Sequence, residues 1–494
     1  MKTTHKNITS DYLRRIRVFT FLMAFVLVFP SCEDVLEERP KTVAVEVFYN
    51  TAEEVETAVN AIYTPLRSNN MVEQVVILDT HTDWGYGRGS RADYNNLQGF
   101  NAANINNAGS RWNDFYLAIR NANLVIDNAP NGTSISQEDI DKYIAEARFL
   151  RAFAYFQLVR NWGSILLRTE ENMLDFDLPK SPVDAVYDLI ISDLTFAENN
   201  LPENQALIGK PTLYAAKTML ADVHLTLGNF SDAMDKANEV IQSGKYSLVP
   251  VQDKEDFQYN LFGPELVTST EEIFYLKYTR EAGQGSWMLW VLSHPSTGNF
   301  NFGGAYAHYS DATNPFYINW SDDDIRKSLW DRIDFGLGAN TIVSSKYIDQ
   351  NAVEQSRGAG NDLPIYRYAE VLLIYAEASA LAANGPTPEG IEALNMVHRR
   401  AYGQDPSAPS EFDFNIADYD AQSFQDLVLQ ERAYEFIFEG KRWYDLKRTG
   451  KTKEVIEPAK GITIAEKAYL WPIPISELDY NASLDPATDQ NPGY

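Results

Sequence analysis

Apolar residues recur every three to four positions over several long stretches of the chain, a spacing that predicts amphipathic helices. In residues 137–161 the apolar side chains share one face. Acidic residues stand at the start of that stretch, where the dipole of a helix favours them. Further helices are expected at 110–128, 182–199 and 421–440. The fold class predicted from this pattern is mainly α.

Two pairs of helices have the pattern of a hairpin. Residues 212–243 hold two apolar stripes around a Gly-Asn turn, with small residues where the helices cross, as in a tetratricopeptide hairpin. Residues 364–401 hold a second pair around a Gly-Pro turn. The helical blocks near 137–243 and 363–440 therefore predict a curved scaffold of helical hairpins with little β-structure.

Two long segments interrupt the helical pattern. Residues 69–109 and 245–362 are rich in Asn, Gly, Tyr and Trp, and they lack a sustained period. Insertions of such length in a helical scaffold are usually functional loops or disordered, and the aromatic content favours order. We therefore expect both segments to be ligand-binding loop regions.

The N-terminal segment has the pattern of a secretory signal. Five basic residues precede an apolar run at 18–29, which is too short to span a bilayer. The only cysteine, Cys32, follows directly, where a bacterial lipoprotein signal places its lipidated residue. We expect residues 1–31 to be removed and Cys32 to anchor the chain in a membrane. Residues 32–45 are then an acidic tether, and residues 46–494 form one globular domain.

The charge balance and the catalytic motifs narrow the possible functions. The chain has 42 basic and 69 acidic residues, a net charge of −27, which disfavours binding to nucleic acid. One cysteine excludes an intrachain disulfide framework. The H-E-x-x-H, P-loop, G-x-S-x-G and C-x-x-C motifs are absent, and Gly85–Gly89 is expected to be a flexible loop. We expect no enzyme activity, although the many acids leave a carboxylate pair of a glycosidase open.

Two charged clusters allow a structural and a functional interpretation. The acids of Ser321–Asp324 either cap a helix that starts near Ile325 or bind a structural calcium ion. We favour the cap and expect no cofactor. The second cluster is Glu431, Arg432, Glu435, Glu439, Lys441 and Arg442. If it lies on one helix, its three glutamates stack at intervals of four residues and pair internally, so we interpret it as structural.

The strongest binding signal lies in residues 283–310, which contain no Asp, Glu, Lys or Arg. Nine aromatic residues in 284–320 give about twice the aromatic content of the whole chain, 13%. Flat rings among amides and hydroxyls suit a neutral, hydroxyl-rich ligand, although Phe300 and Phe302 are expected only to pack the loop. Segment 79–88 offers a second aromatic group, and the sequence leaves open whether the two meet. The candidate ligand-binding residues are Trp84, Tyr86, Arg88, Trp287, Trp290, Asn299, Asn301, Tyr306, Tyr309 and Trp320.

Several separated motifs resemble those of the SusD/RagB family of outer-membrane lipoproteins in Bacteroidota. The resemblance runs from Cys32 to Tyr494 and is specific because of the order and spacing of its motifs. These are AEARFLRAFAYFQLVRNWG at 145–163, LPIYRYAEVLLIYAEA at 363–378, ERAYEFIFEGKRWYDLKRTG at 431–450, YLWPIP at 469–474 and QNPGY at 490–494.

The resemblance implies a fold, a location and a role. Members of the family have a tetratricopeptide-type scaffold decorated with loops, lie on the cell surface and are not enzymes. They cover a SusC-like TonB-dependent barrel and bind a nutrient, usually an oligosaccharide, for import. Glu33 and Asp34 after the cysteine resemble a surface-export signal. The ligand loops vary within the family, so the resemblance assigns no binding residue here. Capture of peptides for a RagA-like importer is the alternative, which the uncharged 283–310 segment disfavours.

Overall fold

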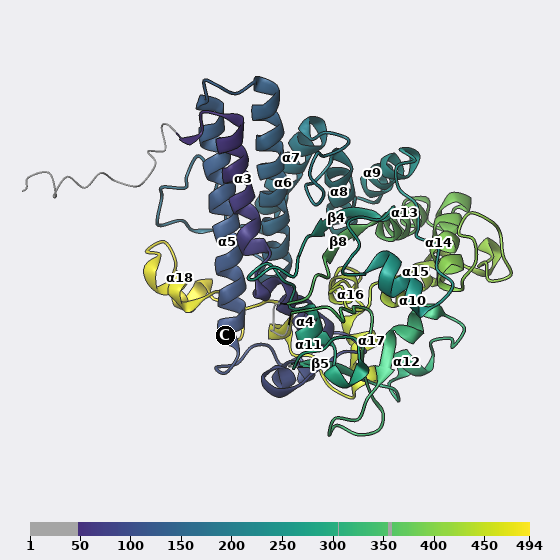
Figure 1. Ribbon diagram of the computed structural model, residues 1–494. Coiled ribbons are helices and arrows are strands. Elements are labelled where there is room, and N and C mark those ends of the chain that lie inside the picture. The colour runs from purple at the N-terminus through teal and green to yellow at the C-terminus, as the bar shows by residue number, and fades with distance from the viewer. Residues whose placement is uncertain (1–47, 305, 354–357) are drawn as a thin grey trace, which may run out of the picture. The chain divides into compact units, whose positions relative to one another are not determined.

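The scaffold consists of long helices that lie side by side (Figure 1). The computed structural model describes residues 48–304, 306–353 and 358–494. The expected signal segment, the lipidated Cys32 and the tether lie outside the described residues. The long helices are α3 (Ala52–Leu66), α5 (Ile105–Asn128), α6 (Gln137–Trp162), α7 (Val183–Asn200), α8 (Leu213–Leu227), α9 (Phe230–Gln242), α13 (Tyr368–Ala383), α14 (Pro388–Ala401) and α15 (Ala421–Glu435).

Most of the predicted helices are confirmed. Helices α5, α6 and α7 cover the three expected segments in the first half, and α8 with α9 forms the predicted hairpin. Ser136 begins α6 by accepting a hydrogen bond of 3.1 Å from the backbone N–H of Asp139. Gly228 ends α8 with φ of 78°, a left-handed conformation that glycine adopts without strain. The mainly α fold class is confirmed.

The helices pack in nearly the order of the chain. Neighbouring helices contact one another in the order α3, α5, α6, α7, α8 and α9. Helix α13 then packs against α9, and it also contacts α14 and α15. Ala233 and Ala237 of α9 are fully buried, and their small side chains allow close approach of the neighbouring helices. The second hairpin therefore continues the array that the first begins.

Residues 363–367 form strand β8 (Leu363–Arg367), so the helix predicted from residue 364 begins only at Tyr368. The strand pairs antiparallel with β4 (Glu272–Leu276), with Tyr366 opposite Phe274. All five of its residues are buried. A strand covered on both faces has no alternation of polar and apolar residues, and periodicity cannot separate it from a buried helix.

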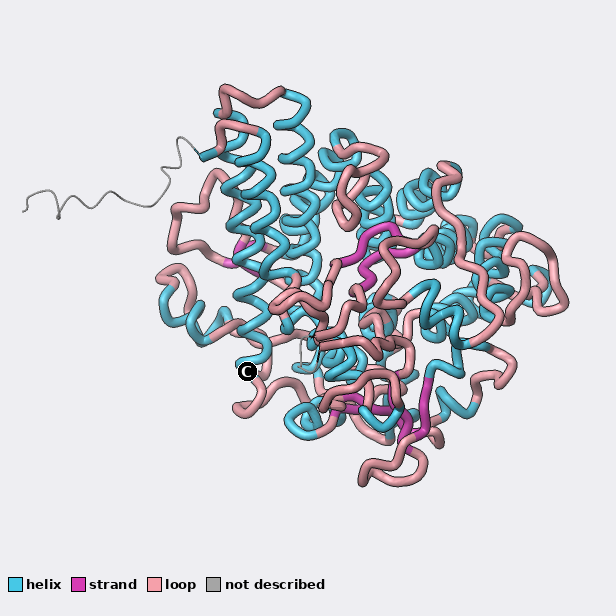
Figure 2. The backbone as a smooth tube through the Cα atoms, in the orientation of Figure 1, coloured by secondary structure: helices cyan, strands magenta, loops and turns pink. Residues whose placement is uncertain are grey.

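Segment 69–109 is not a continuous loop. Residues 69–80 form helix α4 (Asn69–Thr80), and all its residues from Met71 to Thr80 are buried. An all-round buried helix lacks an apolar stripe, which explains why the sequence pattern missed it. Short elements fill much of the rest of both interrupting segments, and Figure 2 shows few strands among the helices. Besides β4 and β8, the strands of the described residues are β1 (Tyr86–Gly87), β2 (Ile165–Leu166), β3 (Lys180–Ser181), β5 (His308–Asp311), β6 (Trp330–Arg332) and β7 (Thr341–Ser344).

The helix expected at 421–440 ends early. Helix α15 stops at Glu435, and Phe438 and Gly440 follow with φ of 61° and 71°. A Cβ on Gly440 would lie 3.4 Å from the Cα of Val75, so this turn packs closely against α4. The sequence suggested that the three glutamates stack on one helix. Glu439 instead lies in the turn after α15, so only Glu431 and Glu435 share that helix. The remaining helices are α10 (Lys254–Asp256), α11 (Met288–Leu292), α12 (Pro315–Ile318), α16 (Arg442–Arg448), α17 (Thr452–Lys460), α18 (Ile475–Tyr480) and α19 (Pro486–Asp489).

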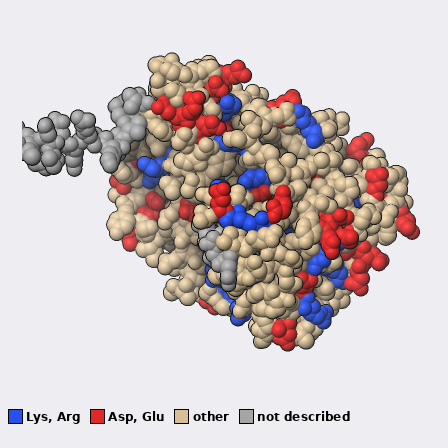
Figure 3. Space-filling view, viewed as in Figure 1, with Lys and Arg blue, Asp and Glu red and all other residues tan. Residues whose placement is uncertain are grey.

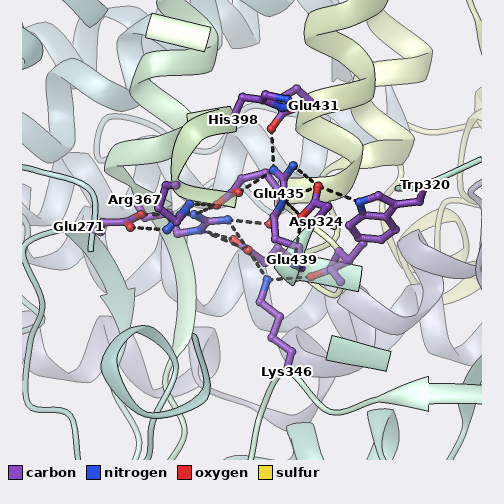
Figure 4. A network of polar contacts seen from close by, with 12 residues as sticks. Glu271, Trp320, Asp324, Lys346, Arg367, His398, Glu431, Glu435 and Glu439 are labelled. Carbon is purple, nitrogen blue, oxygen red and sulfur yellow. Dashed lines mark hydrogen bonds and ion pairs between the residues drawn. The ribbon is translucent and has the colours of Figure 1, made fainter. Parts of the chain in front are cut away.

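A buried network of charges still joins the three glutamates (Figure 4). Arg367 of β8 pairs with Glu439 at 2.9 Å, with Glu271 at 3.4 Å and also with Glu435. Arg326 pairs with Glu431 at 2.7 Å and with Glu435 at 3.0 Å. Each of these side chains is 3% exposed or less. The structural interpretation of the cluster is confirmed, because its members form buried ion pairs. The partners lie outside the cluster, however, and not within it as expected: Arg432 pairs with Asp445 at 2.8 Å and Arg442 with Asp83 at 3.0 Å.

The network also fixes the loop region to the scaffold. Arg326 lies just before β6, and its guanidinium is held at 2.6 Å by Asp324. Asp324 accepts a hydrogen bond from the backbone N–H of Arg326, which confirms that this acid caps a short helix from Ile325. Lys346, just after β7, donates to the Glu439 carboxylate at 2.6 Å. Both ends of the β6–β7 hairpin are thus tied to α15 and the turn that follows it.

Candidate functional site

The two aromatic segments meet in one sheet. Strand β1 of segment 79–88 pairs antiparallel with β5 of segment 283–310, so that Tyr86 lies opposite Tyr309. The backbone N–H of Arg88 donates to the carbonyl of Ala307 at 2.7 Å and extends this pairing. The sheet continues through β7 to β6, in the order β1-β5-β7-β6. The question that the sequence left open is therefore answered, since both segments contribute to one surface.

The β1–β5 pair presents tyrosines on one face and buries other rings on the opposite face. The rings of Tyr86 and Tyr309 stack with centroids 5.6 Å apart, and both remain partly exposed. The ammonium of Lys460 lies 4.7 Å from the centroid of Tyr86, and burial lowers the pKa of this lysine to about 7. His308, next to Tyr309 in β5, is fully buried against Trp84. Neighbours along a strand point to opposite faces, which explains this division.

A second group of rings surrounds Tyr306. Its centroid lies 4.4 Å from that of His294 and 5.2 Å from that of Phe335, and the Arg88 guanidinium carbon lies 4.4 Å from it. Burial and the nearby Arg88 lower the pKa of His294, so its ring is neutral at neutral pH. Tyr306 has φ of 37°, a left-handed conformation that is uncommon for a residue other than glycine. Such conformations cluster at functional sites.

The third group is a stacked pair of tryptophans. Trp287 and Trp290 have centroids 4.6 Å apart and ring planes 13° apart. Trp287 immediately precedes the short helix α11, and Trp290 lies within it. The other residues of this helix are buried, whereas both tryptophans remain partly exposed. The backbone N–H of Tyr306 donates to the carbonyl of Trp290 at 3.0 Å. We call the three linked groups the aromatic surface, which comprises Tyr86, Arg88, Trp287, Trp290, His294, Tyr306, Tyr309 and Phe335.

Two of the predicted stacking residues belong to the core instead. Trp84 is 1% exposed and contacts Trp330 and Phe438 edge-on, both at a centroid distance of 5.5 Å. Trp320 is 2% exposed, stacks on Tyr434 at 4.2 Å and donates its indole N–H to Asp324 at 2.8 Å. Both rings fill the space between the sheet and the end of α15. Neither is available to a ligand, so these two predictions are wrong.

The predicted asparagines differ from one another. Asn299 is 9% exposed, and its amide donates to Asp331 at 3.4 Å, so it supports the loop from inside. Asn301 is exposed and donates to the carbonyl of Gln350 at 3.2 Å. Phe300 and Phe302 are each 3% exposed, which confirms that they pack the loop. Asn301 therefore stays a candidate contact, whereas Asn299 is corrected to a structural residue.

Sequence reasoning missed His294 and Phe335. His294 lies inside the uncharged segment, but a single histidine gave no signal of its own. Phe335 lies in the loop between β6 and β7, and Asp331, Arg332 and Asp334 precede it closely in the sequence. Its ring stacks on that of His294 at 4.8 Å, 14° from parallel. The charges around Phe335 placed it outside the aromatic, uncharged pattern on which the prediction rested.

The described part of the chain offers neither a metal cluster nor a spanning helix. In residues 48–304, 306–353 and 358–494, no three His, Cys, Asp or Glu side chains are grouped so that they could hold a metal ion. Within the same residues, none of the helices combines the length and the apolar character needed to cross a bilayer. On the face shown in Figure 3, acidic and basic side chains are intermingled rather than gathered into a basic patch.

Comparisons with known proteins agree along most of the chain. Residues 297–494 match the model of the SusD family, and residues 34–225 match a model described as starch-binding and associating with the outer membrane. SusD-like protein P38 of Formosa agariphila is 28% identical over 94% of this chain and 97% of its own length.

Solved structures share the architecture. A SusD homologue from Bacteroides thetaiotaomicron, 23% identical, superposes with a TM-score of 0.79 over 91% of this chain and 98% of its own. Surface glycan-binding protein A from Bacteroides fluxus, 22% identical, gives 0.75 over 90% of this chain and 100% of its own. The chain belongs to the SusD/RagB family, as the two family matches, the relative and the shared helical array together show.

Proposed function

We propose that this protein binds an oligosaccharide or polysaccharide at the aromatic surface and does not transform it. The observation that carries the proposal is the pairing of β1 with β5, which brings the aromatic residues of two distant segments together. Trp287, Trp290 and Tyr309 offer partly exposed rings, on which the apolar faces of sugars stack. Arg88, which lies against the ring of Tyr306, and the exposed Asn301 are candidate partners for hydroxyl groups.

The relatives support this proposal. One family model is described as starch-binding, and one structural neighbour is a surface glycan-binding protein. The membership of the SusD/RagB family supports a place at the outer membrane, since the same model is described as associating with it. We further propose that the protein is held there by a lipid on Cys32 and passes its ligand to a SusC-like TonB-dependent barrel.

Alanine at the tryptophan pair tests the binding site. We expect Trp287→Ala and Trp290→Ala each to weaken polysaccharide binding by about 30-fold, because a central aromatic anchor contributes about 2 kcal/mol. The measurement is affinity electrophoresis and calorimetry of residues 33–494 against plant, host and microbial polysaccharides. Peptides in the same screen test the alternative ligand class.

Tyr480→Ala is the matched control, because Tyr480 is 87% exposed on α18, outside the aromatic surface. It should bind as the wild type does, and circular dichroism should show unchanged helices in all variants. Unchanged polysaccharide affinity in both tryptophan variants would exclude this pair as the site. Binding of peptides alone would replace the glycan with a peptide ligand.

The anchor makes a separate prediction. A chain with Cys32→Ala, expressed in its own host, should leave the detergent phase on Triton X-114 partition and appear in the aqueous phase. The reason is the loss of acyl chains, each buried methylene of which contributes about 0.8 kcal/mol to membrane binding. Replacement of Ser31 with alanine is the neighbouring control and should keep the chain in the detergent phase. A Cys32→Ala chain that stays with the detergent would contradict lipidation at this residue.

A further inference from the structure

A pocket of about 500 Å³ lies between α3, the loop at 203–210 and β4, and none of its lining residues belongs to the aromatic surface. Pockets of this size are typical of sites for small ligands. The chain that follows β4 lines the pocket and then leads to Trp287. Its lining residues are Asn60, Tyr63, Arg67, Leu207, Ile208, Gly209, Lys210, Tyr275, Leu276, Lys277, Thr279, Glu281 and Gln284.

One wall of the pocket is apolar and exposed. Leu207 and Ile208 are 55% and 50% exposed, although most apolar side chains of that size are buried in this fold. The loop that carries them crosses close over the end of β4. Gly209 has φ of 90°, and a Cβ there would lie 2.5 Å from Cγ of Lys277. Glycine at this position therefore allows the loop with the apolar wall to lie close to the strand.

The cations of the pocket are already engaged by the protein. Lys210 donates to Glu146 and to Asn60, both at 2.7 Å. Lys277 pairs with Glu272 at 2.8 Å and with Asp362 at 2.7 Å.

Arg67 donates to the side chain of Gln284 at 3.1 Å. A pocket whose cations are paired or hydrogen-bonded in this way offers little attraction to an anion, and the carboxylate of Glu281 in its lining disfavours one further. Both features favour a neutral occupant. The amides and hydroxyl of Asn60, Gln284 and Thr279 at its edge suit hydroxyl groups.

The pocket lies close to the tryptophan pair. Gln284 lines the pocket, and Trp287 follows three residues later. Three residues of extended chain span at most about 11 Å, so the backbone at the rim lies within that distance of the backbone at Trp287. Arg67 fixes this rim, because its guanidinium also reaches the carbonyl of Gln284 at 3.4 Å.

We infer that this pocket is a second subsite of the same binding track, occupied by a neutral sugar unit whose apolar face lies against Leu207 and Ile208. The inference rests on the proposed function and deepens it. The bound glycan is then a chain long enough to reach from the Trp287–Trp290 stack into the pocket. Short fragments occupy only the tryptophan stack. Affinity must therefore rise with chain length.

The test is the length dependence of binding in the whole chain without its signal. Calorimetry with malto-, cello-, laminari- and xylo-oligosaccharides, from disaccharide to hexasaccharide, should show at least one series in which affinity rises by about tenfold with length. Leu207→Asp and Ile208→Asp should each abolish that rise and leave the affinity for the shortest bound member within about twofold. Both positions are exposed, so the fold should tolerate the charge.

Leu174→Asp is the matched control, because Leu174 is 82% exposed in the loop before β3, which takes no part in either subsite. It should keep the full length dependence. A series whose rise survives both Leu207→Asp and Ile208→Asp would overturn the subsite while the proposed function stands. Failure of the wild type to bind any of these series and any polysaccharide of the panel would overturn the proposed function and the subsite together.

Discussion

Replacement of Arg367 with alanine is expected to lower the free energy of unfolding by about 3 to 5 kcal/mol, the largest effect of any substitution considered for this protein. Arg367 is 1% exposed and lies among Glu271, Glu435 and Glu439. Alanine removes the one cation that pairs with all three carboxylates. Arg326, Arg400 and Lys346 remain beside them, so the buried cluster is left short of one positive charge, and an uncompensated buried charge is costly. The measurement is urea unfolding followed by circular dichroism and by tryptophan fluorescence.

Arg332→Ala is the control for the loss of an arginine. Arg332 is exposed in β6, and its guanidinium donates to the side chain of Asn340 at 3.3 Å, so its loss should change the free energy of unfolding by less than about 0.5 kcal/mol. If Arg367→Ala unfolds at the same urea concentration as Arg332→Ala, then the buried network does not hold the strand to α15. The m-value should stay constant in both, as a sign of unchanged two-state unfolding.

Acid should unfold the protein through the same network. Although burial by itself acts in the opposite direction, Arg326 and His398 lower the pKa of Glu431 to about 2. Arg432 and Arg448 do the same for Asp445, also to about 2. A carboxyl group with a lowered pKa in the folded state stabilises fully above its unfolded pKa, near 4.5 for Glu431. This stabilisation is lost as the pH falls from about 4.5 to 2, and for Glu431 it amounts to about 3 kcal/mol.

The measurement is urea unfolding at intervals between neutral pH and pH about 2, compared with Glu431→Gln. Glutamine cannot titrate, so the variant should be less stable at neutral pH and should lose stability less steeply in acid. The difference in slope should approach one proton taken up on unfolding. Parallel pH profiles for the two proteins would contradict the lowered pKa of Glu431.

The scaffold was predictable because its signals are local. The period of 137–161 and the turn at Gly228 lie within single helices or hairpins, so a short window of sequence contains them. The missed elements depend on distant partners. Strand β8 becomes a strand because it pairs with β4, and α4 is covered on all sides by segments from elsewhere in the chain.

The candidate site was predictable in its location but less so in its members. Composition pointed to segments 79–88 and 283–310, and the structure joins them. Composition cannot tell a buried ring from an exposed one, which is why the sequence predicted both Trp84 and Trp287 as ligand-binding residues. Exposure is decided by the face of the strand and by what packs against it. Phe335 lies outside both segments, in the loop between β6 and β7, and only the fold brings it to His294.

The pairing of Tyr86 with Tyr309 has a consequence for how the molecule is made. Helices α3 to α9 contact their neighbours along the chain and can assemble while the rest is still being synthesised or exported. Strand β1 can pair only once β5 is present. The β6–β7 hairpin beside β5 can form its ion pairs only once Glu435 and Glu439 are present. Contacts of such long sequence separation form slowly. Refolding should therefore show early helix formation followed by a slower step, in which tryptophan fluorescence changes as Trp84 is enclosed and the aromatic surface first exists.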